Sequence, residues 1–85
     1  GDATIDKLIS DAHLTRFDYR IAQLDKNAED YAGQKLAIEK EIAAFQLVDC
    51  RKRAKKYPSD MDIRFELGEA CFEAELYDEA VQAFQ

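Results

Sequence analysis

The chain has 85 residues and a mass of 9.7 kDa, which excludes a large enzyme. Its 3 glycines and 1 proline are too few for the frequent turns of a strand-rich fold, so the composition predicts an all-helical protein. The formal net charge of −6 argues against general affinity for nucleic acid or for an anionic membrane, because both are polyanions.

Several other functional classes lack the residues that they need. No apolar run is long enough to span a membrane, and the N-terminus lacks the pattern of a signal peptide. Cys50 and Cys71 form no CxxC pair and His13 is the only histidine, so we expect buried, reduced thiols and no metal site. No catalytic triad, phosphate-binding loop or HExxH motif occurs, which predicts a protein that is not an enzyme and needs no cofactor. The missing export signal and the lone cysteines favour the cytoplasm.

Apolar residues follow a seven-residue repeat between residues 14 and 45. Alternating steps of three and four keep these positions on one stripe of a helix, as in a coiled coil. Lys35 alone interrupts the repeat. This heptad stripe, the predicted dimer seam, consists of Leu14, Phe17, Ile21, Leu24, Ala28, Tyr31, Ile38, Ile42 and Phe45.

Two arrangements of residues 1–57 are compatible with this stripe. In the first, residues 4–57 form one continuous helix, because the apolar phase passes Gly33 without a skip and no proline or Asn-Gly pair enforces a reversal. In the second, residues 26–33 turn the chain and produce an antiparallel helical hairpin. The unbroken repeat favours the continuous helix.

A continuous helix has a consequence for association. About 53 helical residues would extend roughly 80 Å, and such a rod could not bury its own stripe. The stripe therefore predicts a homodimer, most simply a two-fold one. Toward both ends the apolar face rotates away from the stripe, and an antiparallel dimer would cover both rotated faces together. The rotated faces consist of Ile5, Leu8, Ile9 and Ala12 at the start, and of Ala44, Leu47, Val48 and Ala54 at the end.

Charge is distributed in blocks. Residues 51–57 carry five cations and no acid, whereas residues 58–85 carry eight acids and Arg64 as the one cation. The basic run at residues 51–56 admits a nucleic-acid contact. A structural role of this run is favoured instead, because cations stabilise the C-terminal end of a helix and the acidic segment that follows offers partners within the chain. Tyr57-Pro58 ends the helix, because proline disfavours the α conformation of the residue before it.

The segment after Pro58 predicts a pair of shorter helices, so we divide the chain into residues 1–57 and 58–85. Ser59 is placed to cap a helix that starts near Asp60. Residues 75–78 form a short turn in which Asp78 caps the next helix, residues 79–85. The apolar helical pattern continues to the last residue, which we expect of a piece excised from a longer protein.

Residues 58–85 resemble a tetratricopeptide repeat, a 34-residue two-helix unit that stacks into a superhelix. Leu67-Gly68 matches the Leu-Gly pair of the family, and Ala80 and Phe84 match its small and aromatic positions. Glycine and alanine let two helices approach closely where they cross, while Leu67, Tyr77 and Phe84 fill the space around them. Arg64 and Cys71 depart from the usual aromatic positions.

The resemblance implies a non-catalytic scaffold whose first helices line a groove for a partner protein. The corresponding groove positions are Asp62, Phe65, Glu69, Phe72 and Glu73. Carboxylates there repel an acidic tail and suit a basic or aromatic segment. Alternatively, the two phenylalanines pack on a neighbouring helix.

Two functional hypotheses follow. In the first, the chain is a protein–protein interaction scaffold that dimerises through its long helix and recruits an unknown protein or peptide through the repeat. In the second, it is a purely structural spacer or oligomerisation element. Nucleic-acid contact through residues 51–56 is a weaker third.

Overall fold

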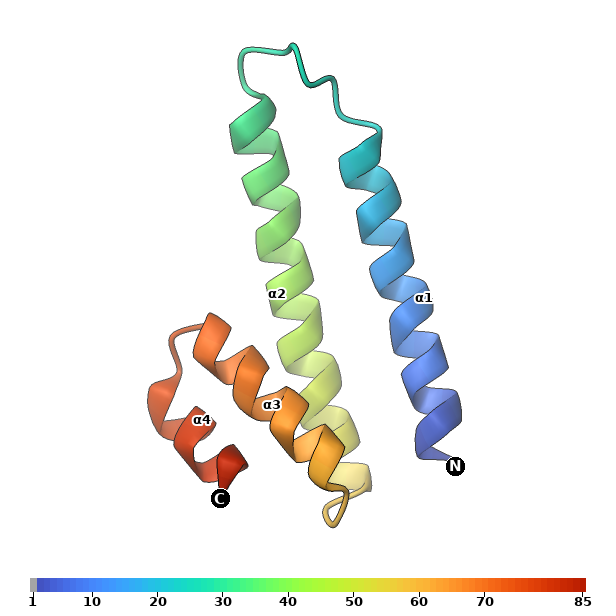
Figure 1. Ribbon diagram of the computed structural model, residues 1–85, viewed down its shortest axis with the longest axis vertical. Coiled ribbons are helices and arrows are strands. Elements are labelled where there is room, and N and C mark those ends of the chain that lie inside the picture. The colour runs from blue at the N-terminus through green and yellow to red at the C-terminus, as the bar shows by residue number, and fades with distance from the viewer. Residues whose placement is uncertain (1) are drawn as a thin grey trace. The chain divides into compact units, whose positions relative to one another are not determined.

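The structure is a computed structural model that describes residues 2–85. Over those residues it is all-helical and contains no strand, as predicted. The four helices are α1 (Ala3–Ala22), α2 (Tyr31–Lys56), α3 (Met61–Glu73) and α4 (Tyr77–Phe84), as Figure 1 shows. The chain divides into two compact units, residues 1–42 and residues 43–85, which we call unit 1 and unit 2. None of the helices that the structure describes is long and apolar enough to cross a membrane.

The predicted continuous helix over residues 4–57 is wrong, because residues 23–30 form a loop between α1 and α2. The Asp25 carboxylate accepts a hydrogen bond from the backbone N–H of Asn27 at 2.9 Å, and the Asp25 carbonyl accepts one from Ala28 N at 3.1 Å. These local bonds compete with the helical pattern. The structure thus follows the second arrangement, with the turn a few residues earlier than residues 26–33 and with Gly33 inside α2.

Within unit 1, α1 and the start of α2 run in opposite directions (Figure 1). Arg20 of α1 and Glu41 of α2 join them through an ion pair of 2.9 Å. Every member of the heptad stripe from Leu14 to Ile42 is half-buried or buried, including Leu24 and Ala28 in the loop. The dimer prediction assumed that one chain could not cover this stripe, and in unit 1 that assumption fails.

The segment that joins α2 to α3 behaves largely as predicted. Helix α2 ends at Lys56, directly before Tyr57-Pro58, with three cations in its last turn. The cap of α3 is Asp60 and not Ser59: the Asp60 carboxylate accepts a hydrogen bond from Ile63 N at 3.1 Å. Aspartate is as good an N-cap as serine, so the cap lies one residue later than the sequence analysis placed it.

The turn between α3 and α4 is a Schellman motif. Glu75 N donates to Phe72 O at 3.0 Å and Leu76 N donates to Cys71 O at 2.8 Å. Glu75 takes a left-handed conformation with φ 62°, which this motif requires and which glycine usually supplies. The next helix begins at Tyr77, after Leu76 and without a side-chain cap, so the prediction that Asp78 caps it is wrong.

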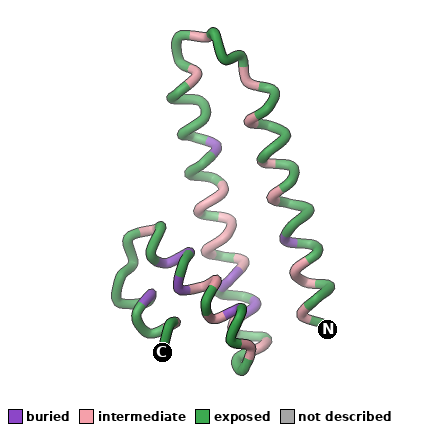
Figure 2. Tube along the Cα trace, in the orientation of Figure 1, coloured by how far each residue is buried: buried purple, intermediate pink, exposed green. Residues whose placement is uncertain are grey.

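Buried residues concentrate in unit 2, on the last turns of α2, on α3 and on α4 (Figure 2). Most are small: the buried positions are Cys50, Arg53, Ile63, Gly68, Ala70, Cys71 and Ala80. Helices α3 and α4 can therefore lie close together. Apart from the buried Ile63 and the half-buried Leu67, the larger apolar side chains of both helices remain near the surface.

Candidate protein-binding face

A buried arginine joins α2 to α3 in unit 2. Only 6% of Arg53 is exposed. Its Nε donates to Asp49 at 3.0 Å, its Nη2 donates to Glu66 of α3 at 2.7 Å, and its Nη2 also lies 3.4 Å from the Cys50 Sγ. Burial is the largest single influence and lowers the pKa of Arg53, but the hydrogen bonds to Glu66 and Asp49 and the nearby negative charges together raise it above its ordinary value. The guanidinium therefore stays charged and fixes α3 against the end of α2.

A second set of polar contacts joins α2 to α4. Arg51 Nη2 donates to both carboxylate oxygens of Glu79, at 2.7 and 2.8 Å. The fully buried Cys71 donates its thiol to Glu79 Oε2 at 3.8 Å, and burial together with the nearby Glu79 charge raises the pKa of that thiol. Both arginines of the basic run thus have acidic partners within the chain. This agrees with the interpretation of the run as an internal counterpart of the acidic segment.

Helices α3 and α4 cross where their side chains are smallest. A Cβ atom added to Gly68 would lie within 3 Å of three atoms of the Phe84 ring, and Ala80 is buried. Glycine and alanine at these positions let the helices approach, as expected from the sequence. Phe84 covers Gly68 and Tyr77 contacts Phe72, as expected of residues that fill the space around the crossing, but about half of each side chain remains exposed.

Six apolar side chains form one continuous surface on these two helices, and we call it the aromatic face. Spacings of four and seven residues put the first three on one side of α3, and spacings of four and three put the other three on one side of α4. Two ring contacts connect the rows: Phe65 to Phe84 and Phe72 to Tyr77, each with centroids 5.4 Å apart. The members are Met61, Phe65, Phe72, Tyr77, Val81 and Phe84, and each is 47–63% exposed.

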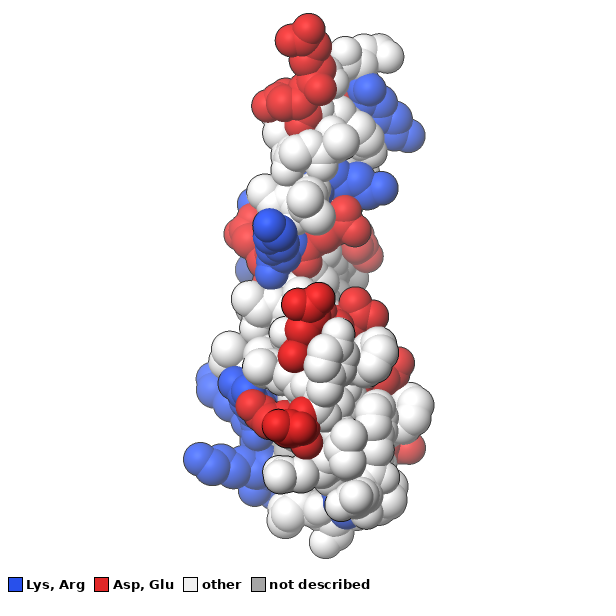
Figure 3. Space-filling model, turned by 90° about the vertical axis from the view of Figure 1, so that its left-hand side faces the viewer, with Lys and Arg blue, Asp and Glu red and all other residues white. Residues whose placement is uncertain are grey.

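The predicted groove residues lie on or beside this face. Phe65 and Phe72 belong to it, whereas Asp62, Glu69 and Glu73 are exposed and border it on the side of α3 away from α4. In Figure 3, carboxylates and uncharged surface alternate over the part of the molecule that α3 and α4 occupy, with cations gathered at one edge. The structure thus brings all five predicted positions onto one surface of unit 2.

Sequence reasoning missed the row on α4. Tyr77 and Phe84 were expected to fill space between the helices, and Met61 and Val81 were not recognised as surface residues of the same patch. The signal was present in the spacing of Tyr77, Val81 and Phe84, which repeats every three or four residues. Ala80 lies inside the same segment and is its buried member.

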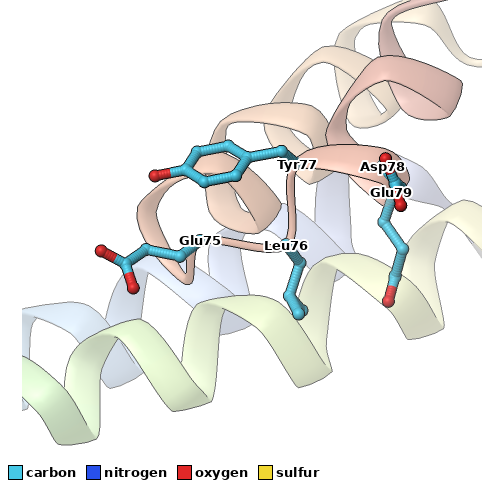
Figure 4. A pocket seen from close by; sticks show the side chains of 5 residues that line it. All are labelled: Glu75, Leu76, Tyr77, Asp78 and Glu79. Carbon is cyan, nitrogen blue, oxygen red and sulfur yellow. The ribbon is translucent and has the colours of Figure 1, made fainter.

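The loop between α3 and α4 lines a shallow, open hollow of about 410 Å³. Its walls are Glu75, Leu76, Tyr77, Asp78 and Glu79. In Figure 4, Leu76 and Glu79 extend toward α2, whereas Glu75 and the Tyr77 ring project to the other side of the loop. Three of the five lining residues carry carboxylates; Glu79 is paired with Arg51, whereas Glu75 and Asp78 are exposed.

Among residues 2–85, no group of three or more His, Cys, Asp or Glu side chains is arranged to hold a metal ion. Comparisons with family models, with curated proteins and with solved structures found no match to this chain. The resemblance to a tetratricopeptide repeat therefore depends on the quoted residues alone.

Proposed function

We propose that the chain is a non-catalytic helical scaffold that binds another protein through the aromatic face of α3 and α4. The single observation that carries the proposal is the exposure of six adjacent large apolar side chains. At about 200 Å² per large side chain, their exposed parts amount to roughly 600 Å². That is at the upper limit of what a monomer leaves uncovered, and it approaches the roughly 800 Å² that one partner contributes to a stable interface.

The tetratricopeptide resemblance supports the same proposal. The close approach of α3 and α4 at Gly68 and Ala80 is the arrangement that the family's small residues permit. Under this proposal, Phe65 and Phe72 act as aromatic anchors, and Asp62, Glu69 and Glu73 form a charged rim.

Photo-crosslinking tests this function. Benzoylphenylalanine is placed at Phe72, and at Tyr19 of α1 as a matched control, because the two aromatic side chains are 59% and 65% exposed. Expressed in the native host, the chain labelled at residue 72 is expected to form one discrete adduct that Phe65→Ala abolishes. Equal adducts from both positions, or none from residue 72, would contradict the proposal. Adduct mass separates a partner protein from a second copy of 9.7 kDa.

A second candidate function is self-association, which the start of α1 favours. Ile5, Leu8 and Ile9 recur at helical spacing and are 55–62% exposed. Pairing of two such stripes would make the chain a dimeric adaptor or an oligomerisation element. Light scattering over a range of concentrations tests this candidate: a dimer that Leu8→Glu dissociates supports it, and single-chain mass at every concentration refutes it.

A further inference from the structure

The border of the aromatic face specifies the charge of its partner. Asp62, Glu69 and Glu73 are exposed along one side of α3, and the structure gives these three no ion pair with any residue from 2 to 85. Asp78 lies on the outer side of α4, where its neighbours are Gln82 and Gln85. Along these two outer sides the face is bordered by carboxylates and uncharged amides, whereas Arg64 contacts it at one end, with its Nη1 3.9 Å from the Met61 Sδ.

None of the cations that the structure describes in unit 2, Lys52, Lys55 and Lys56 included, forms an ion pair with Asp62, Glu69 or Glu73. Arg51 and Arg53 are held by Glu79 and Glu66, which lie toward α2 and away from the face. Arg64 is the one cation of residues 58–85; it contacts Met61 at one end of the face and by helical spacing lies on the side of α3 opposite to the carboxylate row. The electrostatic potential along the rim is therefore negative.

The dimensions of the face match a short helix. Its α3 row runs from Met61 to Phe72, a rise of about 16 Å, which corresponds to three helical turns. The two rows contact each other through the ring pairs Phe65–Phe84 and Phe72–Tyr77 and so form one apolar strip. An amphipathic helix with apolar residues at i, i+3 or i+4 and i+7 can pack along such a strip.

From the apolar rows and the negative rim together, we propose that the face binds an amphipathic helix of another protein, with lysine or arginine on both flanks of its apolar stripe. This rests on the proposed function and adds the partner's chemistry. A second copy of this chain fits less well, because its own face would bring a second row of carboxylates to the rim. The cations of the bound helix pair with Asp62, Glu69 and Glu73, while its apolar side chains cover Phe65 and Phe72.

Titration with three synthetic peptides tests the partner's charge. The first is a 14-residue amphipathic helix with a Leu/Phe stripe flanked by lysines, the second has glutamates in place of the lysines, and the third is a scrambled version of the first. We expect the lysine-flanked peptide to bind at least tenfold more tightly than the glutamate-flanked one, with an affinity that falls as salt rises. We expect no binding of the scrambled peptide, because it lacks the stripe.

Two sets of variants locate the effect. The triple variant Asp62→Asn, Glu69→Gln and Glu73→Gln is expected to remove most of the preference for lysine. A matched control alters exposed carboxylates elsewhere and changes the net charge equally: Asp18→Asn, Glu29→Gln and Glu39→Gln. The control is expected to keep the preference, and circular dichroism checks that both variants remain helical.

The outcomes separate this inference from the proposed function. Equal binding of the lysine-flanked and glutamate-flanked peptides, abolished by Phe65→Ala with Phe72→Ala, overturns the charge inference and leaves the binding face intact. Equal binding of the scrambled peptide also overturns it, because the attraction is then charge alone. Absence of binding by all three peptides overturns the inference, and the crosslink at residue 72 then decides the proposed function. A dimer in light scattering that Phe65→Glu dissociates assigns the face to a second copy instead.

Discussion

The two helical glycines give a quantitative test of how α3 and α4 pack. Gly33 in α2 is exposed, and a Cβ atom there meets nothing within 4 Å. Gly68 in α3 is buried, and a Cβ atom there lies within 3 Å of the Phe84 ring. Replacement of either glycine by alanine removes the same backbone penalty of about 1 kcal/mol in a helix interior. The two variants therefore differ mainly in what the added methyl group contacts.

Gly33→Ala is expected to stabilise the chain by up to about 1 kcal/mol. For Gly68→Ala, the ring of Phe84 has to move. About half of that ring is buried, roughly 100 Å² or about 2.5 kcal/mol of apolar burial, and its contact with Phe65 adds about 0.5–1.5 kcal/mol. A partial loss of these terms outweighs the backbone gain, so we expect a net loss of about 1–2 kcal/mol, within the usual range for overpacking. The two variants should differ by about 2–3 kcal/mol.

Urea denaturation followed by far-UV circular dichroism measures the free energy of unfolding of both variants. The double variant Gly68→Ala with Phe84→Ala serves as the control, because removal of the ring removes the clash. In that background, Gly68→Ala should become neutral or stabilising, a coupling of about 1–3 kcal/mol. Equal stability of Gly68→Ala and Gly33→Ala, or the absence of coupling to Phe84, would refute the close approach of the helices at this point.

The remaining predictions concern unit 2. Arg53→Ala is expected to cost about 2–3 kcal/mol of unfolding free energy in urea, because it leaves two half-buried carboxylates without their partner. Asp60→Ala is expected to cost about 1 kcal/mol and Ser59→Ala almost nothing, since only the former caps α3. Glu75→Gly is expected to raise the melting temperature, gaining up to about 1 kcal/mol at a left-handed residue. The folded state raises the pKa of the Cys71 thiol, so the contribution of this thiol to stability is complete below its ordinary pKa of 9.0 and declines as the pH rises above that value. The stability of the wild type should therefore fall faster than that of Cys71→Ala between pH 8 and 10, and an equal or slower fall would contradict this.

The heptad pattern identified which residues are shielded but not what shields them. The stripe from Leu14 to Ile42 is half-buried or buried, as a seam should be. The periodicity indicates only that one side of the helix packs against apolar surface. That is equally true of a continuous helix in a dimer and of a helical hairpin within one chain. The local signal for the loop was Asp25, whose side chain and carbonyl both accept backbone hydrogen bonds at the break. Aspartate and asparagine favour such turns without any help from proline.

The ends of the helices in unit 2 were easier to predict than the loop of unit 1, because residues next to each end signal most of them. Tyr57-Pro58 marked the end of α2, and Ser59, taken as the cap, marked the start of α3 within one residue of the observed cap, Asp60. The start of α4 was predicted at residue 79 and lies at Tyr77. No side chain caps this helix, and the Schellman turn before it uses a glutamate where glycine is usual, so the sequence gives little signal for the start. The aromatic face was predicted only on α3. Which side of α4 faces solvent depends on how closely Gly68 lets the helices approach, and that is a tertiary property.

The carboxylates of residues 58–85 have different roles in the structure. Glu66 and Glu79 are partners of Arg53 and Arg51, and they hold α3 and α4 to the end of α2. Asp60 caps a helix. The carboxylates that remain exposed beside the aromatic face serve none of these internal contacts, although the basic run lies in the same unit and supplies cations for the others. Asp62 stands in the first turn of α3, where a carboxylate also favours the helix dipole. Under the proposed function, the exposed row of Asp62, Glu69 and Glu73 supplies the charge that a cationic helix would meet.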